Sequence, residues 1–570
     1  MNLLPNAPRT PERAQVPRRS QLAVRWPTET ELRLTLLGIR AQSALWGWLL
    51  PIAIAVIGGA LRFFRLGEPH TLIFDETYYV KDAYSYLFGG FERNWPDEPN
   101  DSFENGDQHI FLDEPEYAVH PPVGKWMIAA GLKIFGTDSS FGWRFAAAVV
   151  GTLSILMIAR IARRLFGSTL LGATAGILLA VDGEHFVHSR TSLLDVFLMF
   201  WVLAAFGALL IDRDQSRIRL SRLMAGWYRA HPFGRRADDG TPTWTLGWWG
   251  PGLGLRPWRI VAGLCLGLAL GTKWSALYFI VAFGLMTVLW DVGARRAAGV
   301  IPYLRATAIK DGIPAFISIV PVALLSYLAS WTGWIRSSGG YDRQWAAEHP
   351  GHPADWLPDW LVSLAHYHFT TYGFHVGLSS DHPYKSNPWG WLVQWRPTSF
   401  YYESYGSGDA GCEAEKCSAA ITSLGNPMLW WLGVIALLVC IGAWALRRDW
   451  RAGAICAGFA AGYLPWFQYQ DRTIYTFYTI VFTPFVVLAV TYLLGLILGP
   501  EQRANAVGPE LLRRFTARPA PPARRLWGAL AAGLIVAIIV ITFAYFYPIY
   551  SAQVIPYQSW NERMWLVTWI

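Results

Sequence analysis

Long apolar runs are the feature of this sequence that most restricts its fold. Stretches of about 18 to 24 residues, each long enough to cross roughly 30 Å of hydrocarbon as a helix, recur between residues 45 and 547. Segments that carry arginine, proline or acidic residues separate them. One such run would be an anchor, whereas many require the chain to cross the membrane repeatedly. The sequence therefore predicts an α-helical polytopic membrane protein.

About eleven transmembrane helices are predicted from these runs. The composition agrees, because 53% of the 570 residues are hydrophobic and only 15% are charged, a balance more apolar than that of a soluble domain. The expected spans are 45–65, 142–162, 168–186, 191–211, 258–274, 275–293, 310–331, 428–446, 451–467, 473–497 and 526–547.

The arginines predict the orientation. A net charge of +8 is also found in nucleic-acid-binding proteins, but here the arginines lie in short clusters beside apolar runs. With the expected spans, these clusters all fall on one side of the membrane, which the positive-inside rule makes cytoplasmic. The clusters are Arg160/Arg163/Arg164, the segment 213–259, Arg295/Arg296, Arg447/Arg448/Arg451 and the segment 503–525.

The alternation of spans divides the chain. No signal peptide is apparent, because the first apolar run begins near Leu45, so residues 1–44 are expected to be a cytoplasmic leader. Residues 45–547 form the expected transmembrane catalytic domain, and 548–570 an extracytoplasmic tail. Within the domain, two large loops, 67–141 and 332–427, are expected outside the membrane on the side opposite the leader.

Two adjacent carboxylates, Asp75 and Glu76, are the first candidates for chemistry. They lie in the first outer loop, just beyond the first span. In a partly dry cleft, one carboxylate could deprotonate a hydroxyl while the other orients or tunes it. Asp75 is also placed where an acidic residue often only caps a helix. A divalent metal bound by the pair stays open, although two carboxylates without further oxygen ligands are few for a hard cation.

Several charged residues near the expected membrane surface suit an anionic lipid headgroup. Lys125 begins an apolar run after the sequence His120-Pro121-Pro122, and Arg144 is flanked by aromatic residues within the second span. Fixed cations at this depth would replace the hydration of a phosphate. Snorkelling to headgroups is the alternative for Lys125.

Further ionisable residues lie at depths in the expected membrane where a charged side chain is energetically unfavourable. Arg190 and Asp195 flank the start of the fourth span, and Lys273 lies between two spans. Each needs a partner in the membrane, so Arg190 and Asp195 could pair locally and hold helices together.

The five cysteines fall into two groups. Cys265, Cys440 and Cys456 lie within apolar runs. Cys412 and Cys417 share a polar loop that is expected to be extracytoplasmic, which predicts a disulfide between them. A zinc site is disfavoured because no second Cys or His pair follows at ligand spacing.

Taken together, these segments resemble the protein O-mannosyltransferase family. The shared features are an Arg upstream of a Phe-Asp-Glu motif, a His-Pro-Pro-x-x-Lys motif and an Arg in the second span, here Arg62, Asp75-Glu76, His120 to Lys125 and Arg144. The similarity continues through Ser189-Arg190-Thr191 with Asp195, Lys273-Trp274, and Tyr463-Leu464-Pro465-Trp466 followed by Arg472. It therefore covers nearly the whole chain.

The resemblance implies a GT-C type glycosyltransferase fold. It further implies a polyprenyl-phosphate mannose donor, Ser/Thr acceptors on exported polypeptides and contact with the protein export machinery. Asp75 and Glu76 are then the expected catalytic residues, with no certain cofactor. The expected substrate or lipid-phosphate ligands are Arg62, His120, Lys125, Arg144, Arg190, Asp195 and Lys273.

Two departures from the family pattern matter. Loop 332–427 is too short to contain the β-trefoil domain of eukaryotic members, which indicates the bacterial branch. Phe477-Tyr478 replaces a histidine pair that some relatives carry after the late Arg. The expected reaction is a single inverting displacement in which Asp75 takes the acceptor proton and cations stabilise the departing phosphate.

Other functions remain open at this point. A GT-C enzyme that moves another sugar onto lipid or cell-wall glycan would keep the same fold. A transporter or flippase would use Arg190, Asp195 and Lys273 along a translocation path. A scaffold for the export machinery would not depend on Asp75. The concentration of acidic and His-Pro-Pro motifs in one outer loop favours the enzyme.

Overall fold

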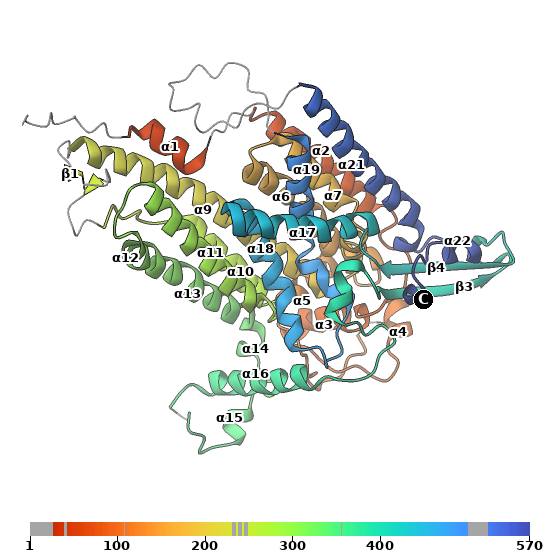
Figure 1. The fold of residues 1–570 in the computed structure, drawn as a ribbon. Helices are drawn as coiled ribbons and strands as arrows, with labels where there is room; N and C mark the ends of the chain where they lie inside the picture. Colours follow the sequence, from red (N-terminus) through yellow and green to blue (C-terminus); the bar gives the residue numbers. More distant parts are fainter. Residues whose placement is uncertain are drawn as a thin grey trace, which may run out of the picture.

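The fold is a helical bundle with a second, mostly irregular layer at one end (Figure 1). The computed structural model describes residues 27–38, 43–107, 109–230, 235–236, 242–243, 249–354, 356–499 and 522–570. Most of the leader and the arginine-containing segment 503–521 lie outside the described residues.

Each of the eleven expected spans coincides with a helix. Within the described residues, seven helices are long and apolar enough to cross a membrane. The long helices are α2 (Trp46–Phe63), α6 (Ser140–Phe166), α9 (Leu194–Ala230), α11 (Ala276–Ala297), α13 (Ile313–Ser330, entered through α12, Tyr303–Thr307), α17 (Pro427–Arg447) and α21 (Pro522–Tyr550). The other four expected spans are the shorter helices α7 (Thr169–Ala180), α10 (Pro257–Leu270), α18 (Trp450–Tyr463) and α19 (Thr483–Leu498).

The tight turn between α6 and α7 illustrates how local sequence sets these boundaries. α6 ends at Gly167, which has φ +65° and adopts the left-handed conformation that favours glycine. Arg163 and Arg164 occupy its last turn, where cations stabilise the negative end of the helix dipole. The Ser168 side chain then caps α7 by accepting a hydrogen bond from the Leu171 amide.

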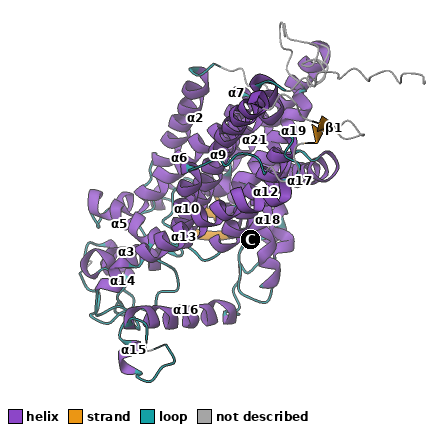
Figure 2. Ribbon diagram, turned by 90° about the vertical axis from the view of Figure 1, so that its left-hand side faces the viewer, coloured by secondary structure: helices purple, strands orange, loops and turns teal. Residues whose placement is uncertain are grey.

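The second layer holds the segments expected outside the membrane. The first loop supplies α3 (Glu76–Gly89), α4 (Asn100–Glu104) and α5 (Val123–Phe135). The second supplies α14 (Thr332–Arg336), α15 (Trp345–Glu348), α16 (Asp359–Gly377) and the strands β3 (Thr398–Gly406) and β4 (Lys416–Ser423). Figure 1 shows the helices α14, α15 and α16 at the end opposite α1 (Glu29–Leu37), with β3 and β4 projecting sideways, and Figure 2 shows α15 and α16 below the bundle.

A small antiparallel sheet joins the second loop to the C-terminal tail. Its strand order is β3-β4-β5, and β5 (Ile555–Pro556) is followed by α22 (Tyr557–Asn561). A disulfide joins Cys412 and Cys417 within the β3–β4 hairpin. A separate short pair, β1 (Arg235–Arg236) and β2 (Pro242–Thr243), lies in the segment after α9.

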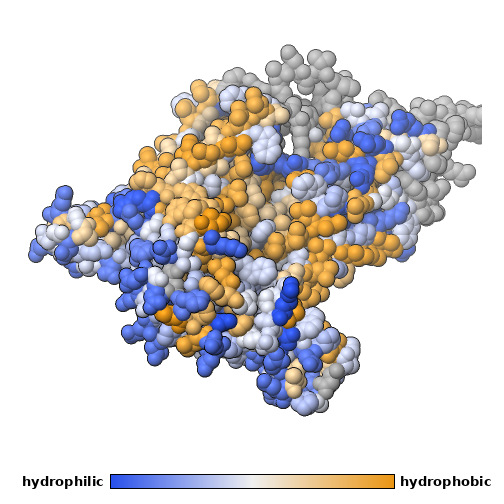
Figure 3. All heavy atoms as spheres, turned by 180° about the vertical axis from the view of Figure 1, so that it is seen from behind, coloured by the Kyte–Doolittle hydropathy of each residue, from blue (hydrophilic) through white to orange (hydrophobic). Residues whose placement is uncertain are grey.

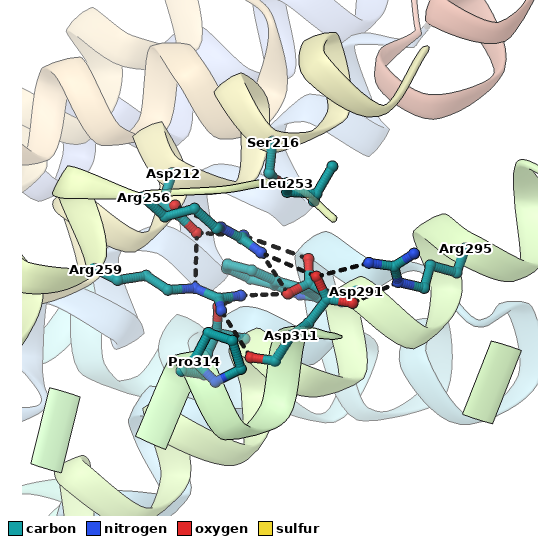
Figure 4. Close-up of polar contacts among 12 residues, drawn as sticks. Asp212, Ser216, Leu253, Arg256, Arg259, Asp291, Arg295, Asp311 and Pro314 are labelled. Atoms are coloured by element: carbon teal, nitrogen blue, oxygen red, sulfur yellow. Dashed lines mark hydrogen bonds and ion pairs between the residues drawn. The ribbon is translucent and has the colours of Figure 1, made fainter. Parts of the chain in front are cut away.

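A buried ionic network fastens the helices near the α1 end of the bundle (Figure 4). Asp212 of α9 and Asp291 of α11 each accept hydrogen bonds from both Arg256 and Arg259. The remaining pair joins Arg295 to Asp311, with 3.1 Å between Nη2 and Oδ1. Buried arginines need such partners, because an unpaired charge in this environment is costly. The network therefore fixes α9, α10, α11 and the start of α13 relative to one another.

The surface carries a broad hydrophobic face (Figure 3). Seen from behind, apolar side chains cover the middle of the molecule, and hydrophilic ones gather on the protrusions below it and at the upper right. Exposed leucines on α11 and α17, such as Leu285 at 62% and Leu438 at 65%, belong to lipid-facing helix surfaces. Such an apolar band is unfavourable in water and matches a membrane-embedded bundle.

Candidate active site

Asp75 lies at the start of α3 without capping it. It occupies the N-cap position, yet its side chain makes no capping hydrogen bond. The preceding residue, Phe74, has φ +49°, a conformation that is rare for an aromatic residue and costs free energy. The Phe74 ring is held by stacking on Phe400 of β3, with ring centroids 4.6 Å apart. The backbone is therefore strained at Phe74, immediately before Asp75. The Asp75 carboxylate makes no capping hydrogen bond and remains available for chemistry.

Glu76, in contrast, is fully buried and its acceptor capacity is occupied. Its carboxylate accepts hydrogen bonds from the Arg144 Nε (2.9 Å) and Nη2 (2.8 Å). The backbone amides of Ser192 (2.8 Å) and Ile73 (3.1 Å) donate the others. The two adjacent carboxylates thus have different environments, and Glu76 serves to hold Arg144 and the neighbouring backbone in place.

Arg144 uses its remaining donors on the first outer loop. Its guanidinium also donates to the carbonyl oxygens of Pro69 and Thr71, at 2.9 Å each, and the residue is 1% exposed. This corrects the expectation that Arg144 binds a lipid phosphate, because no face of the group is left for a substrate. It fastens the loop that carries Asp75 to α6.

A cavity of about 670 Å³ opens beside this loop, between α11, α13, α16 and α18. Its walls are mostly aromatic and aliphatic, as in binding sites for large apolar ligands. At its polar end, Lys273 donates to Asp195 with an Nζ–Oδ2 distance of 2.7 Å. The polar or aromatic residues that line the cavity include His120, Asp195, Lys273, His375, Arg472 and Tyr478.

Arg472 is a second cation at this cavity. Its Nη2 lies 3.3 Å from the His375 Nδ1, while the His375 Nε2 lies 2.8 Å from the Val119 carbonyl oxygen. This arrangement requires the neutral tautomer in which Nε2 carries the proton and Nδ1 accepts from Arg472. The Arg472 Nε is buried and has no hydrogen-bond partner among the described residues. Arg472 can therefore donate to an anion in the cavity.

The environment of Asp75 tunes its basicity. Burial raises the pKa of the Asp75 carboxyl to about 6, an effect that Lys273 opposes and Asp195 reinforces. A hydrogen bond with Tyr79 also favours the ionised form. At neutral pH the group is ionised, and it is a stronger base than an ordinary aspartate.

Two of the three histidines that line the cavity, His120 and His375, are neutral. Burial lowers the pKa of His120 well below its usual value, and Lys273 and His375 lower it further. Burial likewise lowers the pKa of His375 to about 4. Their rings stack with centroids 5.1 Å apart. They can therefore hydrogen-bond a substrate without adding charge.

Lys125 lies away from the cavity in a buried acidic cluster. Its Nζ is 2.6 Å from Glu92 Oε1 and 3.0 Å from Asp82 Oδ2. Burial and the neighbouring Asp82 raise the pKa of Glu116 to about 9 in the same cluster. The expectation that Lys125 meets a lipid phosphate is corrected, because its charge is already neutralised at 1% exposure.

Arg62 and Arg190 hold helices together. Arg62 is fully buried and donates to the Gly58 carbonyl oxygen (2.9 Å), and its Nη2 lies 2.7 Å from His185 Nδ1. Arg190 donates to the carbonyl oxygens of Arg62 and Phe64, both at 2.7 Å, and so completes the last turn of α2. Neither side chain lines the cavity, and Arg190 pairs with these carbonyls instead of Asp195.

The structure therefore brings together Asp75, His120, Asp195 and Lys273 among the expected site residues. The sequence does not indicate His375 and Tyr478 as ligands, because a histidine on an outer-loop helix and an aromatic pair have no distinctive spacing. Arg472 stands out in the sequence only through its place in the motif order. Within the described residues, no group of three or more His, Cys, Asp or Glu side chains could hold a metal ion.

The fold and this site define the class of the protein. The structure of the Saccharomyces cerevisiae protein O-mannosyltransferase Pmt1–Pmt2 complex bound to the sugar donor superposes with a TM-score of 0.65, over 95% of this chain and 94% of that chain, at 14% identity. The chain is thus a polytopic membrane protein with the GT-C glycosyltransferase fold.

Sequence comparison gives the family. Residues 119–227 match the model of dolichyl-phosphate-mannose-protein mannosyltransferases, and residues 361–569 match the C-terminal four-transmembrane region of protein O-mannosyltransferases. The polyprenol-phosphate-mannose–protein mannosyltransferase of Mycolicibacterium smegmatis (strain MKD8) is 38% identical over 92% of this chain and 93% of its own length. That of Corynebacterium glutamicum is 33% identical over 90% and 92%. The chain belongs to the protein O-mannosyltransferase family, which decides against the transporter and scaffold alternatives.

Proposed function

We propose that this enzyme transfers mannose from polyprenyl-phosphate mannose to Ser/Thr hydroxyls of exported proteins. The observation that carries the proposal is an uncapped carboxylate, Asp75, that interacts electrostatically with Lys273 and Asp195 at the polar end of an apolar cavity. Arg472 also lines this cavity. The apolar walls suit a polyprenyl lipid, and the cations suit its phosphate. The family membership supports the identity of the sugar.

The chemistry is a single displacement. Asp75 accepts the proton of the acceptor hydroxyl as the oxygen attacks the anomeric carbon of mannose. The bond from that carbon to the phosphate oxygen breaks, its electron pair leaves with the phosphate, and the configuration inverts. Arg472 and Lys273 stabilise the negative charge that develops on the phosphate. Asp195 keeps Lys273 in place through the 2.7 Å ion pair.

We further infer that the cavity opens on the extracytoplasmic side of the cell membrane and that the N-terminus is cytoplasmic. Arg164, Arg213 and Arg448 lie around a second cavity, at the end of the bundle near α1. By the positive-inside rule, that end faces the cytoplasm. Acceptors would then arrive unfolded, from the protein export machinery.

The direct test uses purified enzyme, synthetic polyprenyl-phosphate mannose and a Ser/Thr peptide. Formation of mannosyl-peptide, detected by mass spectrometry, is the expected result. The same peptide with every Ser and Thr replaced by Ala is the control. Absence of product from the first peptide, or equal transfer from a polyprenyl-phosphate arabinose donor, would contradict the proposed substrates.

The pH dependence of the reaction is a second expected result. Because the pKa of Asp75 is about 6, kcat/KM should rise about tenfold per pH unit below that value and level off above it. Acid protonates the carboxylate and removes the base, so activity is lost as the pH falls. A pH–rate profile from about pH 4.5 to about pH 8 measures this. A profile that is flat across pH 6 would exclude Asp75 as the titrating base.

Arg472→Gln should weaken donor binding. A hydrogen bond to a charged group contributes roughly 1.5–3 kcal/mol, so KM for the donor should rise about 10- to 100-fold. Arg336→Gln is the matched control, since Arg336 is an exposed arginine of α14 that does not line the cavity. Steady-state kinetics with varied donor distinguishes the two variants. An unchanged KM in Arg472→Gln would assign the phosphate to other groups.

A further inference from the structure

A second cavity, of about 1150 Å³, lies near the α1 end of the bundle. It is larger than the roughly 300–1,000 Å³ that small-molecule sites occupy. α11 and α18 form its long walls, and the ends of α1, α6 and α17 close it. Leu285 and Leu289 on its wall are 62% and 65% exposed, so the cavity is continuous with the lipid-facing surface.

Arginines gather around this cavity. Arg164 and Arg213 contact Asp214, and Arg451 pairs with Asp449 at 2.7 Å between Nη2 and Oδ2. The five guanidinium groups lining the cavity thus meet two carboxylates in these pairs. The lining arginines are Arg164, Arg213, Arg217, Arg448 and Arg451.

The neighbouring ionic network attracts Arg217 through Asp291 and Asp212, but it carries no excess negative charge of its own. Its three carboxylates, Asp212, Asp291 and Asp311, are matched by three guanidinium groups of its own (Figure 4). Among the residues that the structure describes, Arg448 lines the cavity, is exposed and makes no ion pair, so its positive charge remains to attract an anion. Because the adjoining walls are apolar, the complementary ligand has both a negative head and long hydrocarbon chains.

We propose that this cavity binds an anionic phospholipid of the leaflet opposite the mannosyl-transfer site. Its phosphate lies among the arginines, nearest Arg448 and Arg451, and its acyl chains run along Leu285 and Leu289 of α11. Basic pockets between transmembrane helices recognise anionic headgroups in this way. Ala461 lines both cavities, but the arginines of this one lie at its far end, near α1, and away from Lys273 and Arg472. The test of lipid binding does not depend on the substrates of the enzyme.

Native mass spectrometry of the delipidated full chain, titrated with phosphatidylglycerol or phosphatidylcholine, tests this proposal. We expect one retained phosphatidylglycerol, and about fivefold weaker retention in Arg448→Gln. The adjacent Arg447→Gln is the matched control, because Arg447 is also exposed at the end of α17 but does not line the cavity. Arg447→Gln should retain the lipid like the unaltered protein.

Several outcomes would overturn the proposal. Equal retention of phosphatidylcholine would show that the negative charge of the lipid does not matter. Equal loss of phosphatidylglycerol in Arg447→Gln and Arg448→Gln would show that the lipid does not bind specifically in the cavity. Displacement of phosphatidylglycerol by inorganic phosphate alone at millimolar concentration would reveal an anion site without a lipid. Displacement by polyprenyl phosphate at equimolar concentration would assign the cavity to the donor or its product.

Discussion

Asp75→Asn should reduce mannosyl transfer by about 10²- to 10⁴-fold, the contribution typical of a general base. The amide keeps the shape of the side chain and can still hydrogen-bond Tyr79. It cannot take the proton of the acceptor hydroxyl at neutral pH. The rate is measured as mannosyl-peptide formation under saturating donor and acceptor, with donor binding measured separately.

The same variant should remain folded. Burial raises the pKa of Asp75, so its ionised form is disfavoured in the folded protein and a neutral amide removes that cost. The melting temperature of Asp75→Asn should therefore equal or exceed that of the unaltered protein. A capping role would preserve activity as well, since Asn caps helices about as well as Asp. Near-normal turnover in Asp75→Asn would reject the proposed mechanism.

Glu76→Gln should instead destabilise the protein, by about 3–5 kcal/mol. The amide leaves the buried Arg144 guanidinium without its counter-charge, and both residues are at most 1% exposed. The loop that carries Asp75 loses its attachment to α6 at the same time. The free energy of unfolding in mixed detergent micelles gives this quantity.

Glu68→Gln is the matched control for stability. Glu68 also pairs with an arginine, Arg65, but the two side chains are 51% and 55% exposed. Exposed pairs contribute about 0–1 kcal/mol, so this variant should be nearly neutral. If Glu76→Gln were as stable as Glu68→Gln while losing all activity, Glu76 would have a direct part in the reaction.

The two carboxylates show how far sequence patterns extend. A Phe-Asp-Glu motif after a membrane span predicts an acidic site, and in the structure the two carboxylates lie at the start of α3. Arg144 pairs with Glu76 and leaves Asp75 available as a base, and Arg144 is 68 residues from Glu76 in the sequence. No local pattern determines which of two neighbouring carboxylates a distant arginine will contact.

The roles of the cations also depend on contacts between segments that are distant in the sequence. Arg144, Lys125 and Arg190 have the residue type and the depth that suit a lipid phosphate. Each is instead neutralised or fully hydrogen-bonded by groups from other segments. Burial alone does not separate a structural cation from a ligand, because both need fixed partners. Arg472 has a buried Nε without a hydrogen-bond partner among the described residues, as Arg62 does, but of these two only Arg472 lines the cavity.

The sequence by itself determined the membrane-spanning helices, because an apolar run of sufficient length must satisfy its backbone hydrogen bonds internally wherever it lies in hydrocarbon. It also determined the acidic loop and the family. Only the tertiary structure decided that Asp75 is uncapped and Glu76 paired, and that Lys273 meets Asp195 across 78 residues. These contacts depend on how the helices pack, since the partners of a buried charge are set by spatial proximity and desolvation, and not by their spacing along the chain.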